Sequence, residues 1–152
     1  ITMKQKIFKT VSTFVVVMLT SFSSLSQGEV VADKLTNDWT LLQSQEGINI
    51  YIRKEKCNVG APELFTYAFI RIINNNTVEK TVEFNFQIQY DNRCVGCGNT
   101  RETKQMLAVP ASTSVEGETT FEIAELSLLI NNPYQKDTGS LESIRLDEFK
   151  IN

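Results

Sequence analysis

Three cysteines are the residues of this chain whose types and spacing can support chemistry. Cys94-Val95-Gly96-Cys97-Gly98 holds two thiols three positions apart, and Cys57 is the third. Such thiols can form a disulfide, exchange with another thiol, or hold a metal ion. The chain contains no histidine, which excludes Ser-His-Asp and Cys-His catalysis and histidine-ligated metal centres.

A structural disulfide is the interpretation that we favour, because the N-terminal sequence predicts export and exported proteins mature in an oxidising compartment. Three thiols allow three pairings, each of which leaves one cysteine over. A Cys94–Cys97 bond would close a small ring and remove little entropy from the unfolded chain. A bond from Cys57 to Cys94 or Cys97 would restrain far more of the chain, and both regions follow predicted strands. The pairing stays open at this point.

Two other interpretations of the Cys94-x-x-Cys97 motif are a thiol redox centre and a metal site. A redox Cys-x-x-Cys usually lies at a helix N-terminus, where the helix dipole lowers the pKa of the first thiol. Here the motif follows a predicted strand and precedes Gly98-Asn99-Thr100. A structural zinc needs four ligands, and only Asp91 is available beside the three cysteines. We therefore predict no cofactor, no metal and no catalytic residue.

The first 26 residues have the pattern of a signal peptide. Lys4, Lys6 and Lys9 precede an apolar run from 11 to 25, and Ser24-Leu25-Ser26 supplies the small residues of a cleavage site. The run is shorter than the roughly 20 apolar residues that cross a bilayer, so it predicts no membrane span. We expect translation to start at Met3, after two upstream residues, and the mature protein to be periplasmic or extracellular.

The charge of the chain excludes a nucleic-acid binder. The full sequence has 15 basic and 18 acidic residues, and cleavage after Ser26 removes three lysines, which leaves a net charge of −6. Nucleic-acid-binding proteins carry a basic surface instead. With 152 residues, of which 41% are hydrophobic, the chain suits one folded domain.

Alternation of apolar and polar residues is the dominant structural signal. Val82, Phe84, Phe86, Ile88 and Tyr90 alternate with polar residues, which is typical of a half-buried antiparallel strand. The other predicted strands cover 39–43, 48–52, 64–73, 104–109, 115–123, 126–130 and 143–151, and they are separated by turn residues. In the last strand the alternation changes phase, which predicts a bulge near Asp147-Glu148.

Seven or eight short strands of this kind predict an all-β fold, an antiparallel two-sheet sandwich of the immunoglobulin-like type. An open barrel is the structural alternative. We expect a signal peptide at 1–26, a flexible lead at 27–38 and the β-sandwich domain at 39–152.

Several short motifs follow one another along the mature chain. They are Trp39-x-x-Leu42, Gly47-Ile48-x-Ile50-Tyr51, Cys57, Ile70-x-Ile72-x-Asn74 and Cys94-x-x-Cys97-Gly98. In this order they resemble small exported immunoglobulin-like β-sandwich proteins of Bacteroidetes-type bacteria, over most of the mature chain. Those proteins largely lack an assigned activity, so the resemblance implies a fold and a compartment and no reaction.

Aromatic residues of the strand at 64–73 form the candidate binding surface. If Ala68, Ile70 and Ile72 face the core, then three aromatic residues face outward, with a fourth on a neighbouring strand. The four are Phe65, Tyr67, Phe69 and Tyr51. Exposed aromatic rings would suit a glycan or protein partner. The alternative that we favour is a central strand whose outer face is covered by a loop or by the N-terminal lead.

Two further groups of side chains have structural interpretations. Trp39 opens an alternating strand, so we expect it to be a core residue. Glu116, Glu118, Glu122 and Glu125 lie in a polar segment, where carboxylates are normally solvated.

These observations together predict a non-catalytic binding or structural accessory module of the cell envelope. Its expected partner is an envelope protein or a glycan. The alternative function is thiol redox chemistry or metal binding at Cys94 and Cys97. The oligomeric state stays open.

Overall fold

The computed structural model describes residues 28–98, 104–137 and 139–152, so the predicted signal peptide lies outside the described residues. The described residues form ten β-strands and one short 3-10 helix, η1. The elements are β1 (Glu29–Val31), β2 (Thr40–Gln45), β3 (Ile48–Cys57), β4 (Phe65–Asn74), β5 (Lys80–Tyr90), β6 (Cys94–Val95), β7 (Lys104–Val109), β8 (Thr113–Glu116), η1 (Ala124–Leu126), β9 (Ser127–Asn131) and β10 (Leu141–Ile151). None of the helical segments among these residues is long and apolar enough to span a bilayer.

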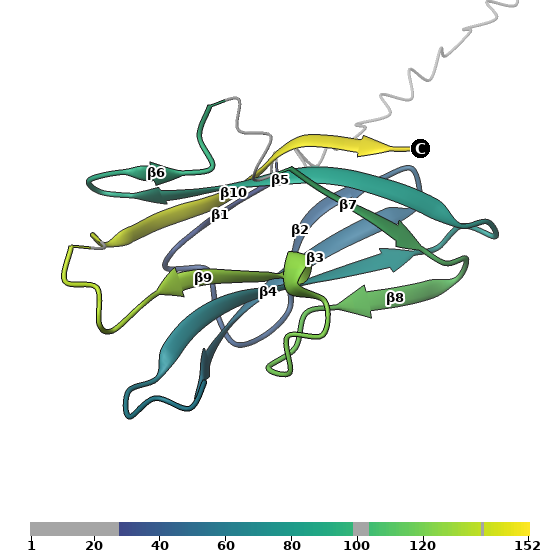
Figure 1. Ribbon diagram of the computed structural model, residues 1–152. Helices are drawn as coiled ribbons and strands as arrows, with labels where there is room; N and C mark the ends of the chain where they lie inside the picture. The colour runs from purple at the N-terminus through teal and green to yellow at the C-terminus, as the bar shows by residue number, and fades with distance from the viewer. Residues whose placement is uncertain (1–27, 99–103, 138) are drawn as a thin grey trace, which may run out of the picture.

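The strands form two antiparallel sheets that pack face to face (Figure 1). In sheet A, β10 lies between β1 and β5, and the other edge of β5 pairs with β6 along one half and with β7 along the other. Sheet B has the order β2-β3-β4, and the free edge of β4 is shared in the same way by β8 and β9. The predicted two-sheet antiparallel sandwich is therefore confirmed.

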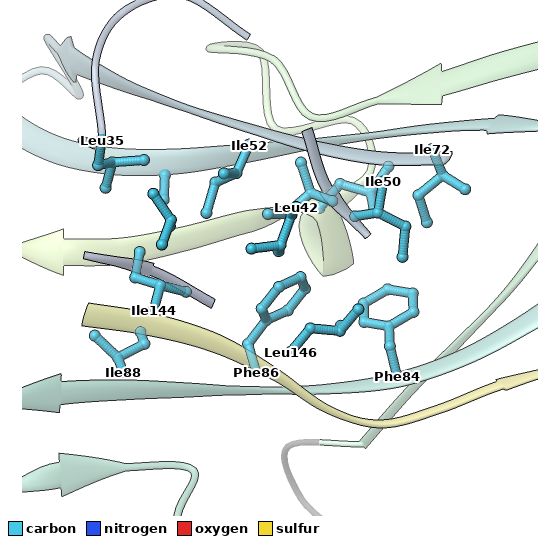
Figure 2. Close-up of a cluster of buried hydrophobic side chains, with 14 of the residues drawn as sticks. Leu35, Leu42, Ile50, Ile52, Ile72, Phe84, Phe86, Ile88, Ile144 and Leu146 are labelled. Carbon is cyan, nitrogen blue, oxygen red and sulfur yellow. The ribbon is translucent and has the colours of Figure 1, made fainter. Parts of the chain in front are cut away.

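The core lies between the sheets and follows from the alternation within each strand. Phe84, Phe86 and Ile88 of β5 point toward Ile50 and Ile52 of β3 (Figure 2). Ala68, Ile70 and Ile72 of β4 also face this core, as predicted. Fully burying one such large side chain contributes about 1.5–3 kcal/mol. The core thus holds the two sheets together.

The bulge predicted in the last strand is present. Asp147 of β10 pairs with Asn85, but the next partners are Lys150 and Glu83, so β10 contains one residue more than β5 over this stretch. Glu148 adopts a positive φ of 50° there. The extra residue explains why the inward-facing positions change phase after Leu146.

Two predicted boundaries are wrong. Of the segment predicted as a flexible lead, residues 28–38 are described and are held by the sandwich, because β1 pairs with β10 and Leu35 is buried in the core. The strand predicted at 115–123 ends at Glu116, where the chain leaves sheet B. A Cβ atom at Gly117 would lie 2.1 Å from the carbonyl oxygen of Leu126, so this close approach requires glycine.

Candidate functional site

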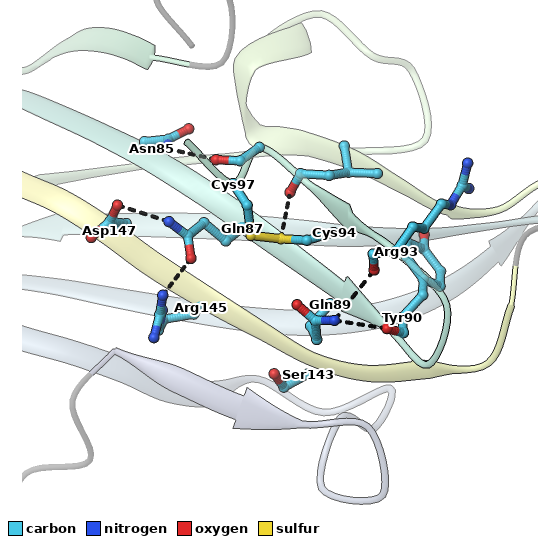
Figure 3. The surroundings of a disulfide bond; sticks show 12 residues. Asn85, Gln87, Gln89, Tyr90, Arg93, Cys94, Cys97, Ser143, Arg145 and Asp147 are labelled. Carbon is cyan, nitrogen blue, oxygen red and sulfur yellow. Dashed lines mark hydrogen bonds between the residues drawn. A yellow bond between two sulfur atoms is a disulfide. The ribbon is translucent and has the colours of Figure 1, made fainter. Parts of the chain in front are cut away.

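The Cys94-x-x-Cys97 motif forms a disulfide loop on sheet A. The two cysteines are paired with a Cα–Cα distance of 5.7 Å, which lies within the normal range for a disulfide. Gly96 has a φ of 78°, and a Cβ atom there would lie 2.3 Å from the carbonyl oxygen of Phe86. The side-chain amide of Asn85 donates to the carbonyl oxygen of Gly96 at 3.3 Å (Figure 3). Glycine is therefore what allows the loop to lie against β5.

Cys57 takes no part in this disulfide. It ends β3 in sheet B, opposite Phe65, and only 4% of its surface is exposed. Burial raises the pKa of the Cys57 thiol, and the nearby carboxylate of Glu55 raises it further. The bond from Cys57 to Cys94 or Cys97 that the sequence left open is not formed.

The surroundings of the motif do not match those of a helix-based redox site. Cys94 belongs to β6, and no helix begins at either cysteine in the described part of the chain. Within the same residues, no three cysteine, aspartate or glutamate side chains gather into a metal-binding group.

An array of aromatic and arginine side chains covers the outer face of sheet B. We call it the aromatic face; its members are Trp39, Arg53, Phe65, Tyr67, Phe69, Arg71, Phe121, Leu129 and Tyr134. Tyr67 and Phe69 stack with ring centroids 6.0 Å apart, and Phe121 tilts over both at 4.7 and 6.0 Å. Phe121 belongs to the segment between β8 and η1, so a loop covers this part of β4. This is the covered arrangement that we favoured from the sequence.

The four aromatic residues predicted as a binding surface differ in exposure. Phe65, Tyr67 and Phe69 do share the outer side of β4, and Tyr51 lies on the neighbouring strand β3. Phe69 is 0% exposed, so it is not a contact residue for a partner. The other three are half-buried. Burial and the nearby Cys57 raise the pKa of the Tyr67 hydroxyl.

Trp39 lies on the aromatic face and not in the core, which corrects the prediction. It precedes β2 and is half-buried. The guanidinium groups of Arg53 and Arg71 lie 4.8 and 4.3 Å from its ring centroid, at cation–π distance. Arg53 also lies 5.8 Å from the ring of Phe69, so the stack around Trp39 continues into the aromatic rings of β4.

Two glutamates hold the arginines of this stack. Glu55 forms an ion pair with Arg53 at 3.0 Å, and Glu116 forms one with Arg71 across the β4–β8 pairing. Glu116 is therefore not simply solvated, whereas Glu118, Glu122 and Glu125 are exposed as predicted. The sequence did not predict this stack, because its members come from four separate segments.

The aromatic face ends in an exposed apolar area near the β3–β4 hairpin. Tyr134 is 53% exposed, and its ring centroid lies 5.9 Å from that of Phe65. Leu129 is 41% exposed and lies opposite Tyr67 in the β4–β9 pairing. Leu64, at the end of the hairpin, is 48% exposed. The side chains of Leu129 and Tyr134 lie next to the stacked rings, so covered and exposed parts form one surface.

A polar pocket of about 240 Å³ lies on the outer face of sheet A. We call it the glutamine pocket; its lining residues are Glu29, Gln87, Gln89, Cys97, Ser143 and Arg145. The alternation in β5 predicts that Gln87 and Gln89 face away from the core. It does not predict the pocket, because β1 and β10 come from opposite ends of the chain.

No family model, no curated protein and no solved structure matches this chain.

Proposed function

We propose that this protein is a non-catalytic binding module of the cell envelope and that its partner contacts the aromatic face. The observation that carries the proposal is the exposure of Leu129 and Tyr134 beside a stack of half-buried rings. Scattered apolar side chains are normal on a protein surface, but adjacent ones that form a patch favour an interaction site.

The composition of the face favours a protein partner over a glycan. Tyrosine, tryptophan and arginine dominate the binding energy of many protein interfaces, and aliphatic residues fill the space around them. The aromatic face combines these residue types, and the cation–π contacts of Trp39 order Arg53 and Arg71 before a partner arrives. Side chains that are already ordered lose less entropy on binding.

The envelope location rests on the sequence pattern of residues 1–26. In that compartment a small sandwich with an acidic surface would act as an accessory to another envelope protein. The resemblance to exported proteins of Bacteroidetes-type bacteria agrees with this role.

Site-specific photo-crosslinking in the cells that produce the protein tests the proposal. A photoreactive amino acid at Tyr134 should give adducts with an envelope protein. The matched position is Met106, which is 63% exposed on the other sheet and should give none. Equal labelling from both positions, or no adduct from Tyr134, would exclude the aromatic face as the contact surface.

Trp39 offers a second measurement with the purified partner. It is the only tryptophan in the chain and lies within the aromatic face, so its fluorescence should change when a partner binds there. Leu129→Asp should abolish the change, and Met106→Asp should preserve it. A fluorescence change on adding oligosaccharides, without any crosslinked protein, would instead assign a glycan to this face.

A further inference from the structure

The glutamine pocket brings one positive and one negative side chain together beside the disulfide. Glu29 of β1 and Arg145 of β10 are direct partners in the strand pairing. Glu29 accepts a hydrogen bond from the Ser143 hydroxyl at 2.7 Å, whereas Arg145 donates to the side-chain oxygen of Gln87 at 2.5 Å. The two charges are thus held by different neighbours and remain separate at the wall of the pocket.

The amide side chains of the pocket are also held in place. Gln87 donates to the Asp147 carboxylate at 2.9 Å, and Gln89 donates to the carbonyl oxygens of Tyr90 and Arg93 at 2.8 and 3.4 Å. Figure 3 shows the side chain of Gln87 beside the disulfide, between Arg145 and Asp147. The pocket therefore has a defined shape in the absence of a ligand.

The size and charge of this pocket point to a small zwitterion. A guanidinium group binds a carboxylate, and a carboxylate binds an ammonium group, in charge-assisted hydrogen bonds. A pocket of about 240 Å³ is smaller than the roughly 300–1,000 Å³ that hold drug-sized ligands. An amino acid carries both charges at this size.

Cys97 provides a reactive atom at the same place. It lines the pocket and is exposed, whereas Cys94 is half-buried and does not line it. Exposed disulfides are the ones that exchange readily with thiols. The four-residue loop contributes little to stability, so opening it costs the fold little.

We propose that the glutamine pocket binds a zwitterionic thiol of the cysteine type, which then exchanges with the disulfide at Cys97. Arg145 would hold the carboxylate of the ligand, and Glu29 would hold its ammonium group. This inference goes beyond the proposed binding function and does not depend on it, because the pocket and the aromatic face lie on opposite sheets.

The exchange balances without any further oxidant. The thiolate of the ligand attacks Sγ of Cys97, the Cys94–Cys97 bond breaks, and Cys94 leaves as a thiolate that takes up a proton. The product is a mixed disulfide between the ligand and Cys97. A second thiol can attack this bond and release the oxidised ligand, which leaves both protein cysteines reduced.

The test compares small thiols that differ in charge. The oxidised protein is mixed with L-cysteine, cysteamine, 3-mercaptopropionate or 2-mercaptoethanol, quenched with acid and analysed by peptide mass spectrometry. We expect the mixed disulfide on Cys97. Per thiolate, L-cysteine should react about tenfold faster than cysteamine, which lacks the carboxylate, or 3-mercaptopropionate, which lacks the ammonium group.

Two variants test which residue holds the carboxylate of the ligand and which holds its ammonium group. Arg145→Gln should bring the rate with L-cysteine down to that with cysteamine, and Glu29→Gln should bring it down to that with 3-mercaptopropionate. Both should change the rate with 2-mercaptoethanol, which has neither a carboxylate nor an ammonium group, much less than the rate with L-cysteine. Lys34→Gln and Glu125→Gln remove the same charges at exposed positions and should leave all four rates unchanged.

Competition by L-alanine tests the proposal on the protein without substitutions, so its result does not depend on whether the variants fold. L-alanine has the same two charges without a thiol, so at high concentration it should slow the reaction with L-cysteine. Equal rates per thiolate for all four thiols, mixed disulfide on Cys94, or no competition by L-alanine would each overturn the proposal. These results would leave crosslinking from Tyr134 unaffected, so the two proposals can fail separately.

Discussion

The outer faces of the two sheets differ sharply, although both sheets have the same layout. In sheet A the outward residues of β5 are Glu83, Asn85, Gln87 and Gln89, and all four bond to polar groups. Glu83 pairs with Lys104 of β7, Asn85 bonds to the disulfide loop, Gln87 bonds to Asp147 of β10, and Gln89 bonds to backbone carbonyls at the turn that follows β5. In sheet B the outward residues of β4 are Phe65, Tyr67, Phe69 and Arg71, and they stack with rings from distant segments. Strand alternation thus selects the face on which a side chain lies, while the residues around it decide whether it is buried.

Substitution of Phe69 should cause the largest loss of stability among the variants that compare the two outer faces. Phe69→Ala should destabilise the protein by about 3–5 kcal/mol, because the ring is fully buried on the outer face. Gln87→Ala at a comparable position of sheet A should cost less than about 1 kcal/mol. Urea unfolding of both variants measures the contrast. Similar losses in the two variants would mean that sheet B is not covered as described.

The disulfide loop offers a test of close packing on sheet A. Gly96→Ala should cost about 1–3 kcal/mol more than Gly98→Ala. Both glycines have a positive φ, but a Cβ atom at Gly96 would meet the Phe86 carbonyl, whereas no atom lies within 4 Å at Gly98. Equal free energies of unfolding for the two variants would show that the loop lifts away from β5.

The cation–π contact between Trp39 and Arg53 should contribute a coupling free energy that is smaller than these two effects but still measurable. A double-mutant cycle with Trp39→Ala and Arg53→Ala should give a coupling free energy of about 0.5–1 kcal/mol. The corresponding cycle for Arg145 and Gln87 on sheet A should give less, because Arg145 is exposed and its bond competes with water. A larger coupling on sheet A would reverse the ranking of the two faces.

The rate at which the Cys57 thiol is alkylated should depend on pH. Burial and Glu55 raise its pKa, so its thiolate is scarcer than that of a free thiol at the same pH. Alkylation of the non-reduced protein should label one thiol slowly at neutral pH, and the rate should rise as the pH approaches the raised pKa.

The same shift affects unfolding in alkaline solution. Above the ordinary pKa of a thiol, the unfolded chain binds fewer protons at Cys57 than the folded chain does, so the free energy of unfolding falls as the pH rises. Cys57→Ala should remove this part of the pH dependence. Fast alkylation at neutral pH would contradict the burial of Cys57.

Local alternation was enough to predict much of the fold. The inward positions of β4 and β5 and the bulge after Asp147 follow from period-two patterning, which depends on neighbouring residues alone. The flexible lead was mispredicted because β1 is held by β10, more than a hundred residues away in the chain. Trp39 was mispredicted because the arginines that stack on it lie on β3 and β4.

The sequence by itself determined the all-β class, the pairing of two sheets and the absence of histidine chemistry, because these depend on composition and on the two-residue repeat of a strand. Which cysteines pair, which rings remain exposed and where the two charges of the glutamine pocket lie depend on the tertiary structure. The physical reason is register: pairing between distant strands selects which outward side chains become neighbours, and no local pattern contains that information.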